Sequence, residues 1–356
     1  MKKKTFQIAF MPYAPIEEKF SLGQYEIWPF YKEAEKMIND KEALEQLRKF
    51  FGRYFEFKRQ KELKSHGEQL CQVIIISPQD FKIGQDMLSE NQKIEIQSVA
   101  HILAFSSIFE IGFTSTTSDP FLVHLQGFVK NEEGMTVWNK AYTNYSLFKV
   151  LKPLYVESSL FPYRPTDLSK ALAKSLELKE SNKNVKRILH SLELIYHTVT
   201  FGEMITNEHR LLTLVMAFEV LLDFENKLDF VKSIQRYIND HNPTYVEREI
   251  YSERNKKQLQ KWSITSWWIY DLYDLRSEII HGENAQWKLK EYGFIWQRVS
   301  FAGNLLKRIY KILLREVGLW KDDFMSSLVE VYDMDEKLVE IINEFKEMNP
   351  EVYNEK

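Results

Sequence analysis

Apolar residues recur every three or four positions through most of the second half of this chain, which is the spacing of one face of an α-helix. The clearest example lies between 206 and 224, where one face carries Leu211, Leu214, Val215, Phe218, Leu221 and Leu222. The same spacing marks the segments 168–179, 185–199, 228–239, 265–281 and 295–317. Consecutive amphipathic helices bury their apolar faces against one another, so this half is predicted to be a helical bundle.

The first 150 residues mix strand and helix patterns. Short runs rich in β-branched or aromatic residues predict strands at 6–10, 24–28, 72–76 and 121–129. Helical spacing predicts helices at 42–55 and 94–105. Interleaved strands and helices predict a mixed α/β domain, whose strand order the sequence does not give.

Three prolines separate the two patterns. Pro153, Pro162 and Pro165 precede Thr166 and Asp167, which suit the N-cap of a helix. We therefore place a boundary near 155–165 and predict an α+β protein. It has a mixed α/β domain at 1–160, an all-α helical bundle at 161–322 and a C-terminal helical extension at 323–356.

The composition narrows the class of protein. A chain of 356 residues with 24 Phe, 18 Tyr and 8 Trp has enough apolar material for two cores. The net charge of −3 gives no overall basic field, so any nucleic-acid binding needs a local patch. A single cysteine, Cys71, excludes an internal disulfide and a multi-cysteine zinc site. No apolar run reaches the ~20 residues that a membrane helix needs, so we expect a cytoplasmic protein without a membrane partner.

The segment Tyr273-Asp-Leu-Arg-Ser-Glu-Ile-Ile-His-Gly282 ends a predicted helix and carries the sharpest chemical signal. Arg276 falls at the edge of the apolar side of this helix, and the polar arc consists of Asp274, Ser277, Glu278 and His281. A guanidinium can clamp a phosphate in bidentate fashion, and an imidazole exchanges protons near neutral pH. Arg276 and His281 therefore suit cleavage of RNA without a metal.

The same residues also suit a structural role. Glu219 lies in a row of apolar neighbours on the helix at 206–224, so an ion pair between Arg276 and Glu219 would tie two helices together. His281 would then be a C-terminal helix residue before a Gly282 cap, where the helix dipole favours it. The two roles are compatible, because a carboxylate can hold a catalytic arginine in place.

The spacing of arginine and histidine is not specific by itself. It recurs at Arg236 and His241, where the following Asn242-Pro243 indicates a turn. We interpret this second pair as a solvated helix end without a chemical role.

The motif segment and the earlier segment Arg210-Leu-Leu-Thr-Leu-Val-Met-Ala-Phe-Glu219 together resemble the HEPN superfamily, in particular its Apea-like branch. The resemblance covers roughly residues 180–320 and implies a helical bundle that forms a homodimer. It implies Arg276 and His281 as the catalytic pair and Glu219 as the acidic residue of the earlier helix. Ser277 stands where active members often carry Asn, Asp or His. Many members are metal-independent RNA endonucleases of antiphage, abortive-infection or toxin systems, and others are non-catalytic partners.

These residues predict a reaction in which the 2′-hydroxyl of RNA attacks the neighbouring phosphorus and leaves a 2′,3′-cyclic phosphate. The reaction needs a base, an acid and a cation for the phosphorane charge. One histidine cannot easily be both base and acid, so two Arg276–His281 pairs in one cleft of a dimer suit it better. We expect Ser277 and Glu219 to complete the catalytic site, with no metal and no cofactor.

A basic and aromatic stretch precedes the motif helix. Basic and aromatic side chains together suit the phosphates and bases of single-stranded RNA. The predicted RNA-binding residues are Arg254, Lys256, Lys257 and Lys261, followed by Trp262, Trp267 and Trp268. The alternative interpretation of this stretch is a solvated loop beside core tryptophans.

Two functions other than catalysis stay open. One is a non-catalytic interaction module, in which Arg276 and Glu219 serve the architecture alone. The other is a regulatory subunit of a toxin–antitoxin or defence complex. In each case the N-terminal domain is expected to sense a trigger or to bind a protein partner.

Overall fold

The computed structural model describes residues 4–56, 72–110, 121–131, 134–138, 163–199, 206–238, 243–251, 257–282, 295–321 and 334–348. Within these ranges the protein is α+β, as predicted: an antiparallel sheet with helices comes first, and a mostly helical region with a small hairpin follows. The chain divides into two compact units, residues 1–179 and 180–356. Cys71 lies outside the described residues.

The first unit contains a six-stranded sheet in the order β2-β3-β4-β1-β5-β6, with every neighbouring pair antiparallel. The four predicted strands are confirmed as β1, β3, β4 and β5. Two short hairpin partners, β2 and β6, were not predicted. The strand bounds are β1 (Lys4–Ala14), β2 (Phe20–Leu22), β3 (Tyr25–Pro29), β4 (Gln72–Pro78), β5 (His124–Asn131) and β6 (Gly134–Trp138).

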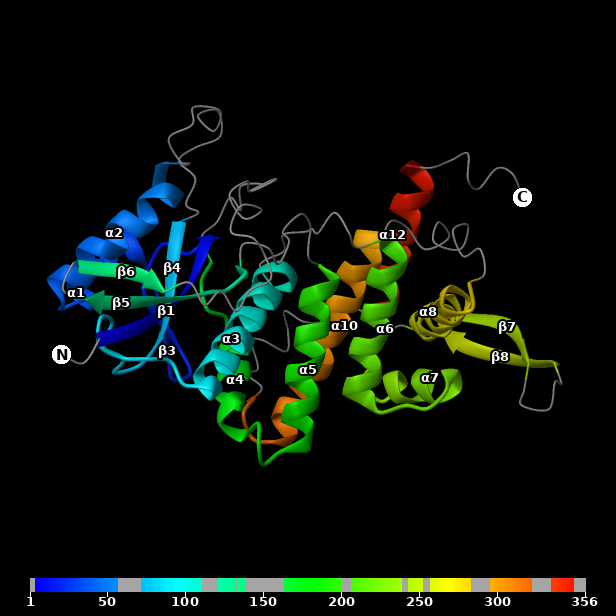
Figure 1. Ribbon diagram of the computed structural model, residues 1–356. Helices are drawn as coiled ribbons and strands as arrows, with labels where there is room; N and C mark the ends of the chain where they lie inside the picture. Colours follow the sequence, from blue (N-terminus) through cyan, green and yellow to red (C-terminus); the bar gives the residue numbers. More distant parts are fainter. Residues whose placement is uncertain are drawn as a thin grey trace. The chain divides into compact units, whose positions relative to one another are not determined.

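Helices cover both faces of this sheet (Figure 1). Alternate residues of β1, such as Phe6, Ile8 and Phe10, point to the face covered by α1 (Phe30–Met37) and α2 (Lys41–Glu56), where they join one apolar core. The opposite face meets α3 (Glu90–Phe109), which begins at a capping box formed by Ser89 and Gln92. Burial on both faces explains why β4 reads as an uninterrupted apolar run in the sequence.

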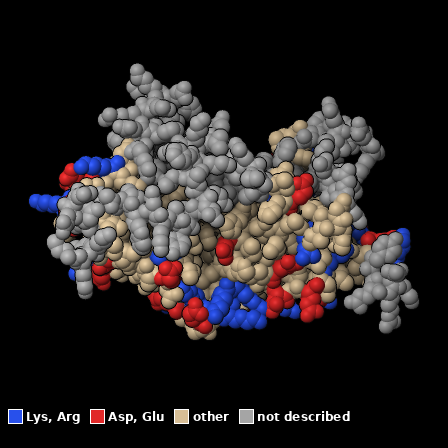
Figure 2. Space-filling model, in the orientation of Figure 1, with Lys and Arg blue, Asp and Glu red and all other residues tan. Residues whose placement is uncertain are grey.

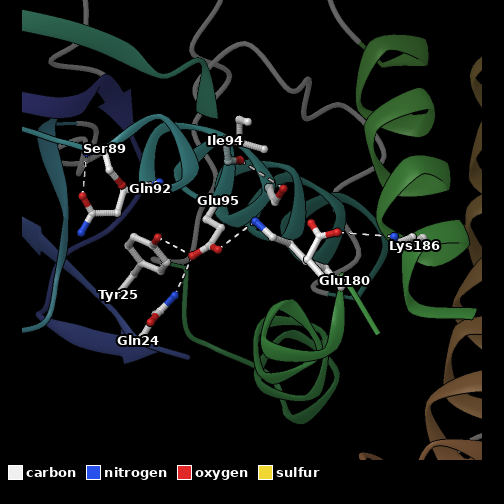
Figure 3. Close-up of polar contacts among 10 residues, drawn as sticks. Gln24, Tyr25, Ser89, Gln92, Ile94, Glu95, Glu180 and Lys186 are labelled. Atoms are coloured by element: carbon white, nitrogen blue, oxygen red, sulfur yellow. Dashed lines mark hydrogen bonds and ion pairs between the residues drawn. The ribbon is translucent and has the colours of Figure 1, made fainter. Parts of the chain in front are cut away.

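A carboxylate on α3 ties this helix to the sheet. The Glu95 carboxylate accepts hydrogen bonds from Gln24 at 2.6 Å, Tyr25 at 2.7 Å and Lys179 at 2.8 Å (Figure 3). Burial alone raises the pKa of Glu95, but the hydrogen bonds from Lys179, Tyr25 and Gln24 outweigh burial and hold this pKa below its usual value. Burial, and then the contact with Glu95, raises the pKa of Tyr25 above its usual range. The charged form of Glu95 is therefore part of the folded structure of this unit.

Helix α4 (Asp167–Ser175) and the short 3-10 helix η4 (Leu176–Leu178) belong to the first unit. The Thr166 side chain caps α4 by accepting from the Ser169 backbone N–H, and it donates to the Glu110 carboxylate at 2.6 Å. Ser106 of α3 donates to the same carboxylate at 2.5 Å. These hydroxyls join the end of α3 to the start of α4, so the units divide between Lys179 and Glu180, later in the chain than the prolines indicate.

The second unit is built mainly from helices that agree with the predicted ones. Its core includes Leu214 and Phe218 of α6, Trp268 of α8 and Phe301 of α10, all buried. The tail contributes one described helix, α12, which contacts α8 and α10. The helix bounds are α5 (Lys183–Thr198), α6 (Asn207–Leu222), α7 (Lys227–Gln235), α8 (Ile264–Ile280), α10 (Ile295–Glu316) and α12 (Met334–Met348).

The polar stretch at 240–262 contains a β-hairpin that the sequence analysis missed. Strands β7 (Tyr245–Tyr251) and β8 (Lys257–Ser263) pair antiparallel, with Val246 opposite Trp262 and Glu247 opposite Lys261. Most side chains of β8 are exposed, so the hairpin has little of the apolar alternation that marks a half-buried strand. This hairpin leads directly into α8, which begins at the residue after β8 ends (Figure 1).

Charges are mixed over the surface of the described residues. Figure 2 shows basic and acidic side chains next to one another on the drawn face. At the N-terminal end of α5, for example, Lys183 and Arg187 both contact Asp223, the C-cap of α6. Of the helices described, none is both long and apolar enough to cross a membrane.

Candidate active site

Helix α8 carries the motif and ends where the sequence predicts. Ser263 caps its first turn, because its side chain accepts from the Ser266 backbone N–H. At the other end His281 is the C-cap, and its backbone N–H donates to the Ser277 carbonyl at 3.1 Å. Gly282 follows with a φ of +73°, the left-handed conformation that glycine adopts without strain. The predicted Gly282 cap is confirmed.

Arg276 and Glu219 form the predicted ion pair between α8 and α6. The Arg276 Nη2 atom lies 3.0 Å from Glu219 Oε1. The Arg276 guanidinium also lies over the Tyr273 ring, 5.4 Å from its centroid. Although both residues belong to apolar rows in the sequence, the pair is only partly buried: the two side chains keep 27% and 26% of their surface exposed. Glu219 thus orients the guanidinium while solvent still reaches it.

His281 is exposed at the C-terminal end of α8, and Ser277 is half-buried one turn earlier. A helix turns by roughly 100° per residue, so five positions separate two side chains by roughly 140°. Arg276 and His281 therefore leave α8 in different directions. The structure brings Arg276 to Glu219, whereas Ser277 meets His281 through a backbone hydrogen bond.

A second ion pair lies beside the motif and was not predicted. Lys227, the first residue of α7, contacts the Asp274 carboxylate at 2.6 Å, and its ammonium lies 3.8 Å from the centroid of the Tyr270 ring. Burial lowers the pKa of Lys227, but the hydrogen bonds to Asp274 and Tyr270 more than offset burial and raise it above its usual value. The ammonium is therefore held in its charged form beside the polar arc of α8.

The hairpin is attached to α8 by a third ion pair. Arg248 of β7 contacts Asp271 at 2.8 Å and lies over the Trp267 ring, 5.0 Å from its centroid. The Trp267 indole N–H donates to the Val246 carbonyl at 2.8 Å. Three side chains of α8 thus contact three different elements: Asp271 contacts the hairpin, Asp274 contacts α7 and Arg276 contacts α6.

The two predicted RNA-binding lysines that the structure describes, Lys257 and Lys261, each have a carboxylate as neighbour on the hairpin. Lys257 of β8 pairs with Glu249 at 2.8 Å, and Lys261 lies opposite Glu247. Neighbouring carboxylates reduce the local positive field that a phosphate backbone needs. Arg254 and Lys256 lie outside the described residues.

The expectation that Trp267 and Trp268 stack on bases is wrong. Both side chains are buried in the second unit, at 1% and 2% exposure. Trp268 packs against Phe301, and Trp267 against Trp262 and Tyr270. Burial of a large aromatic ring removes much apolar surface from water and so stabilises the fold. The alternative interpretation, in which these are core tryptophans, is therefore correct for Trp267 and Trp268.

The second arginine–histidine spacing offers a matched comparison. Arg236 is exposed at the end of α7, in agreement with the predicted solvated helix end. His241 lies outside the described residues. In the described ranges, no group of three or more His, Cys, Asp or Glu side chains is arranged to hold a metal ion.

Comparison with known proteins adds no identification. No protein-family model matches this chain, and neither a curated protein nor a solved structure gives a match. The chemistry of α8 is therefore the basis for a functional proposal.

Proposed function

We propose that this protein is a metal-independent RNA endonuclease of the HEPN type that works as a homodimer in the cytoplasm, in an antiphage, abortive-infection or toxin-type response. One observation carries the proposal: Glu219 holds the Arg276 guanidinium at the surface, 3.0 Å away, while His281 stands exposed at the end of the same helix. A fixed cation and a titratable imidazole are the groups that cleavage of a phosphodiester requires.

Arg276 has the role of stabilising the transition state. Attack of the 2′-oxygen on phosphorus places extra negative charge on the non-bridging oxygens, and an oriented guanidinium donates to two of them at once. The contact with Glu219 occupies one side of the guanidinium, and the exposed part is free to meet a phosphate. Orientation by a carboxylate removes part of the entropy cost of fixing a long side chain.

His281 has the role of moving protons. As a base it removes the proton from the 2′-hydroxyl, and as an acid it gives a proton to the departing 5′-oxygen. The O5′–P bond breaks as the O2′–P bond forms, so the products are a 2′,3′-cyclic phosphate and a 5′-hydroxyl. No water and no redox partner enters this step.

Two copies of α8 suit this reaction better than one. Because Arg276 and His281 leave the helix in different directions, a second chain can complete a site that one chain leaves open. Exposed apolar side chains beside the ion pair support such an interface. Met216 lies one turn before Glu219 on α6 and is 45% exposed, and Ile280 lies one turn after Arg276 on α8 and is 53% exposed.

The test is cleavage of end-labelled single-stranded RNA by the purified chain in EDTA. Arg276→Ala and His281→Ala are each expected to lower the cleavage rate by at least about 100-fold while the far-UV circular dichroism spectrum stays unchanged. Arg236→Ala is the matched control, because Arg236 has the same spacing to a histidine but lies at a solvated helix end. Full cleavage by His281→Ala would rule out the proposed mechanism.

A second candidate is a non-catalytic interaction module. It is favoured by the contacts of Arg276 with both Glu219 and Tyr273, which give the guanidinium a structural role without any ligand. In this case the wild-type chain leaves every RNA intact, and Arg276→Ala changes only stability or partner binding.

A further inference from the structure

A residue of α12, Asp335, helps to cap the N-terminus of α8. A helix leaves its first backbone N–H groups without partners inside the helix. The Ile264 N–H donates to the Thr244 carbonyl at 2.9 Å, and the Ser266 N–H donates to the Ser263 hydroxyl at 3.2 Å. Only the Thr265 N–H then needs a partner in this turn, and it donates to Asp335 Oδ1 at 2.8 Å.

The second oxygen of Asp335 binds the base of the hairpin. Asp335 Oδ2 accepts from the Thr244 N–H at 2.7 Å. Thr244 directly precedes β7, and Thr265 is the second residue of α8. One carboxylate on the first turn of α12 therefore binds both ends of the segment that forms the hairpin.

Burial distinguishes this contact from the three ion pairs along α8. Asp335 has 0% of its surface exposed, whereas the side chains of the three ion pairs along α8 keep 24–40% exposed. Partly exposed ion pairs contribute little because water screens them, while a buried carboxylate that receives two backbone N–H groups interacts strongly. The positive end of the α8 dipole favours the same negative charge.

We infer that Asp335 is a positioning residue: through α12 it fixes the start of α8 and, along this rigid helix, the placement of Arg276 and His281. Helix α12 then contributes to the candidate active site by positioning α8. The link to catalysis rests on the proposed function, whereas the link to α8 does not.

The first test is amide hydrogen exchange of the full chain, followed by mass spectrometry. In Asp335→Ala, peptides that cover Thr244 and Thr265 are expected to exchange at least about tenfold faster, and so is the last turn of α8. Asp335→Asn keeps one carbonyl oxygen, so it is expected to protect one of these two amides but not both. Glu336→Gln is the matched control, because Glu336 is the exposed neighbour on the same turn.

Three exchange results would overturn the inference. The first is faster exchange confined to the first turn of α8, since the last turn would then be placed by other contacts. The second is equally faster exchange in α5 and α8, since Asp335 would then support the whole unit and not α8 in particular. The third is unchanged exchange at Thr265, which would contradict the hydrogen bond itself.

The second test separates this inference from the nuclease proposal. If wild-type protein cleaves RNA, Asp335→Asn is expected to lower kcat by at least about tenfold with little change in KM, because RNA contacts remain while the reacting groups are displaced. An unchanged kcat together with faster exchange in α8 would refute the positioning role. If wild-type protein cleaves no RNA, the nuclease proposal fails, and the exchange of the last turn of α8 alone decides whether Asp335 positions it.

Discussion

Arg276 of α8 and Glu219 of α6 meet at 3.0 Å, 57 positions apart in the sequence, with about a quarter of each side chain in solvent. A partly exposed pair of this kind contributes about 0–1 kcal/mol to stability. We expect Glu219→Gln to lower the free energy of unfolding by no more than that amount. If Glu219 orients a catalytic arginine, the same change lowers RNA cleavage far more than stability. Denaturant unfolding and cleavage rates of one sample make the comparison.

His281→Ala is expected to leave stability within about 0.5 kcal/mol of wild type, because the side chain is exposed at a helix end. Loss of a general acid or base lowers a rate by about 10²–10⁴-fold. Single-turnover cleavage and thermal unfolding of the variant check both numbers. A variant that unfolds at a much lower temperature would show instead that His281 supports the fold.

Met216→Asp and Ile280→Asp are expected to separate a homodimer into monomers. Both side chains are exposed in the single chain, so neither change should unfold it. Sedimentation velocity over a concentration series measures the outcome. Leu259→Asp is the control, since Leu259 is equally apolar and 64% exposed but lies on the hairpin strand β8. Dissociation by the control alone would place the interface on the hairpin.

Lys227 and Asp274 are expected to be energetically coupled. Lys227→Met leaves the Asp274 carboxylate without its cation, and Asp274→Asn in the same chain removes the unpaired charge. Asp274 is more than one-third exposed, so the coupling is expected to be about 0.5–1 kcal/mol after screening by solvent. A double-mutant cycle of unfolding free energies measures it. Simple additivity of the two single changes would show that the contact has no energetic role.

Glu95 should make the first unit sensitive to acid. Its pKa is lower in the folded protein than in the unfolded chain, so the folded state is stabilised above the unfolded pKa of about 4.5. This stabilisation is lost as pH falls through the lowered pKa. We expect wild type to be more stable than Glu95→Gln at pH 7 and the difference to shrink below about pH 4.5. A difference that stays constant from pH 7 to pH 3 would contradict this assignment.

Local patterns predicted most helices and strands, because each depends on residues a few positions apart. The apolar spacing located α6 and α8, and Gly282 correctly predicted the end of α8. The pairing of Arg276 with Glu219 was also predictable, since each is a charge in an apolar row that needs a partner. Its exposure was not, because it depends on how closely the two helices approach.

Contacts between distant segments escaped prediction. Lys227 and Asp274 are 47 positions apart, and Asp335 and Thr265 are 70 apart, with nothing in either local sequence that indicates the other. The hairpin escaped for a different reason. Its strands carry alternating charges on an exposed face, and among the hairpin residues whose burial is described Ile250 is the one buried apolar side chain. Such strands are held by the helix beside them more than by their own apolar pattern.

The place of α4 has a practical consequence for anyone who divides this protein. A cut at residue 160 would remove α4 from the sheet domain and leave the carboxylate of Glu110 without the Thr166 hydroxyl that it binds. Leu168 and Leu172, now hidden, would be exposed on the severed helix and invite aggregation. A cut after Lys179 avoids both problems and also retains the ammonium that neutralises Glu95.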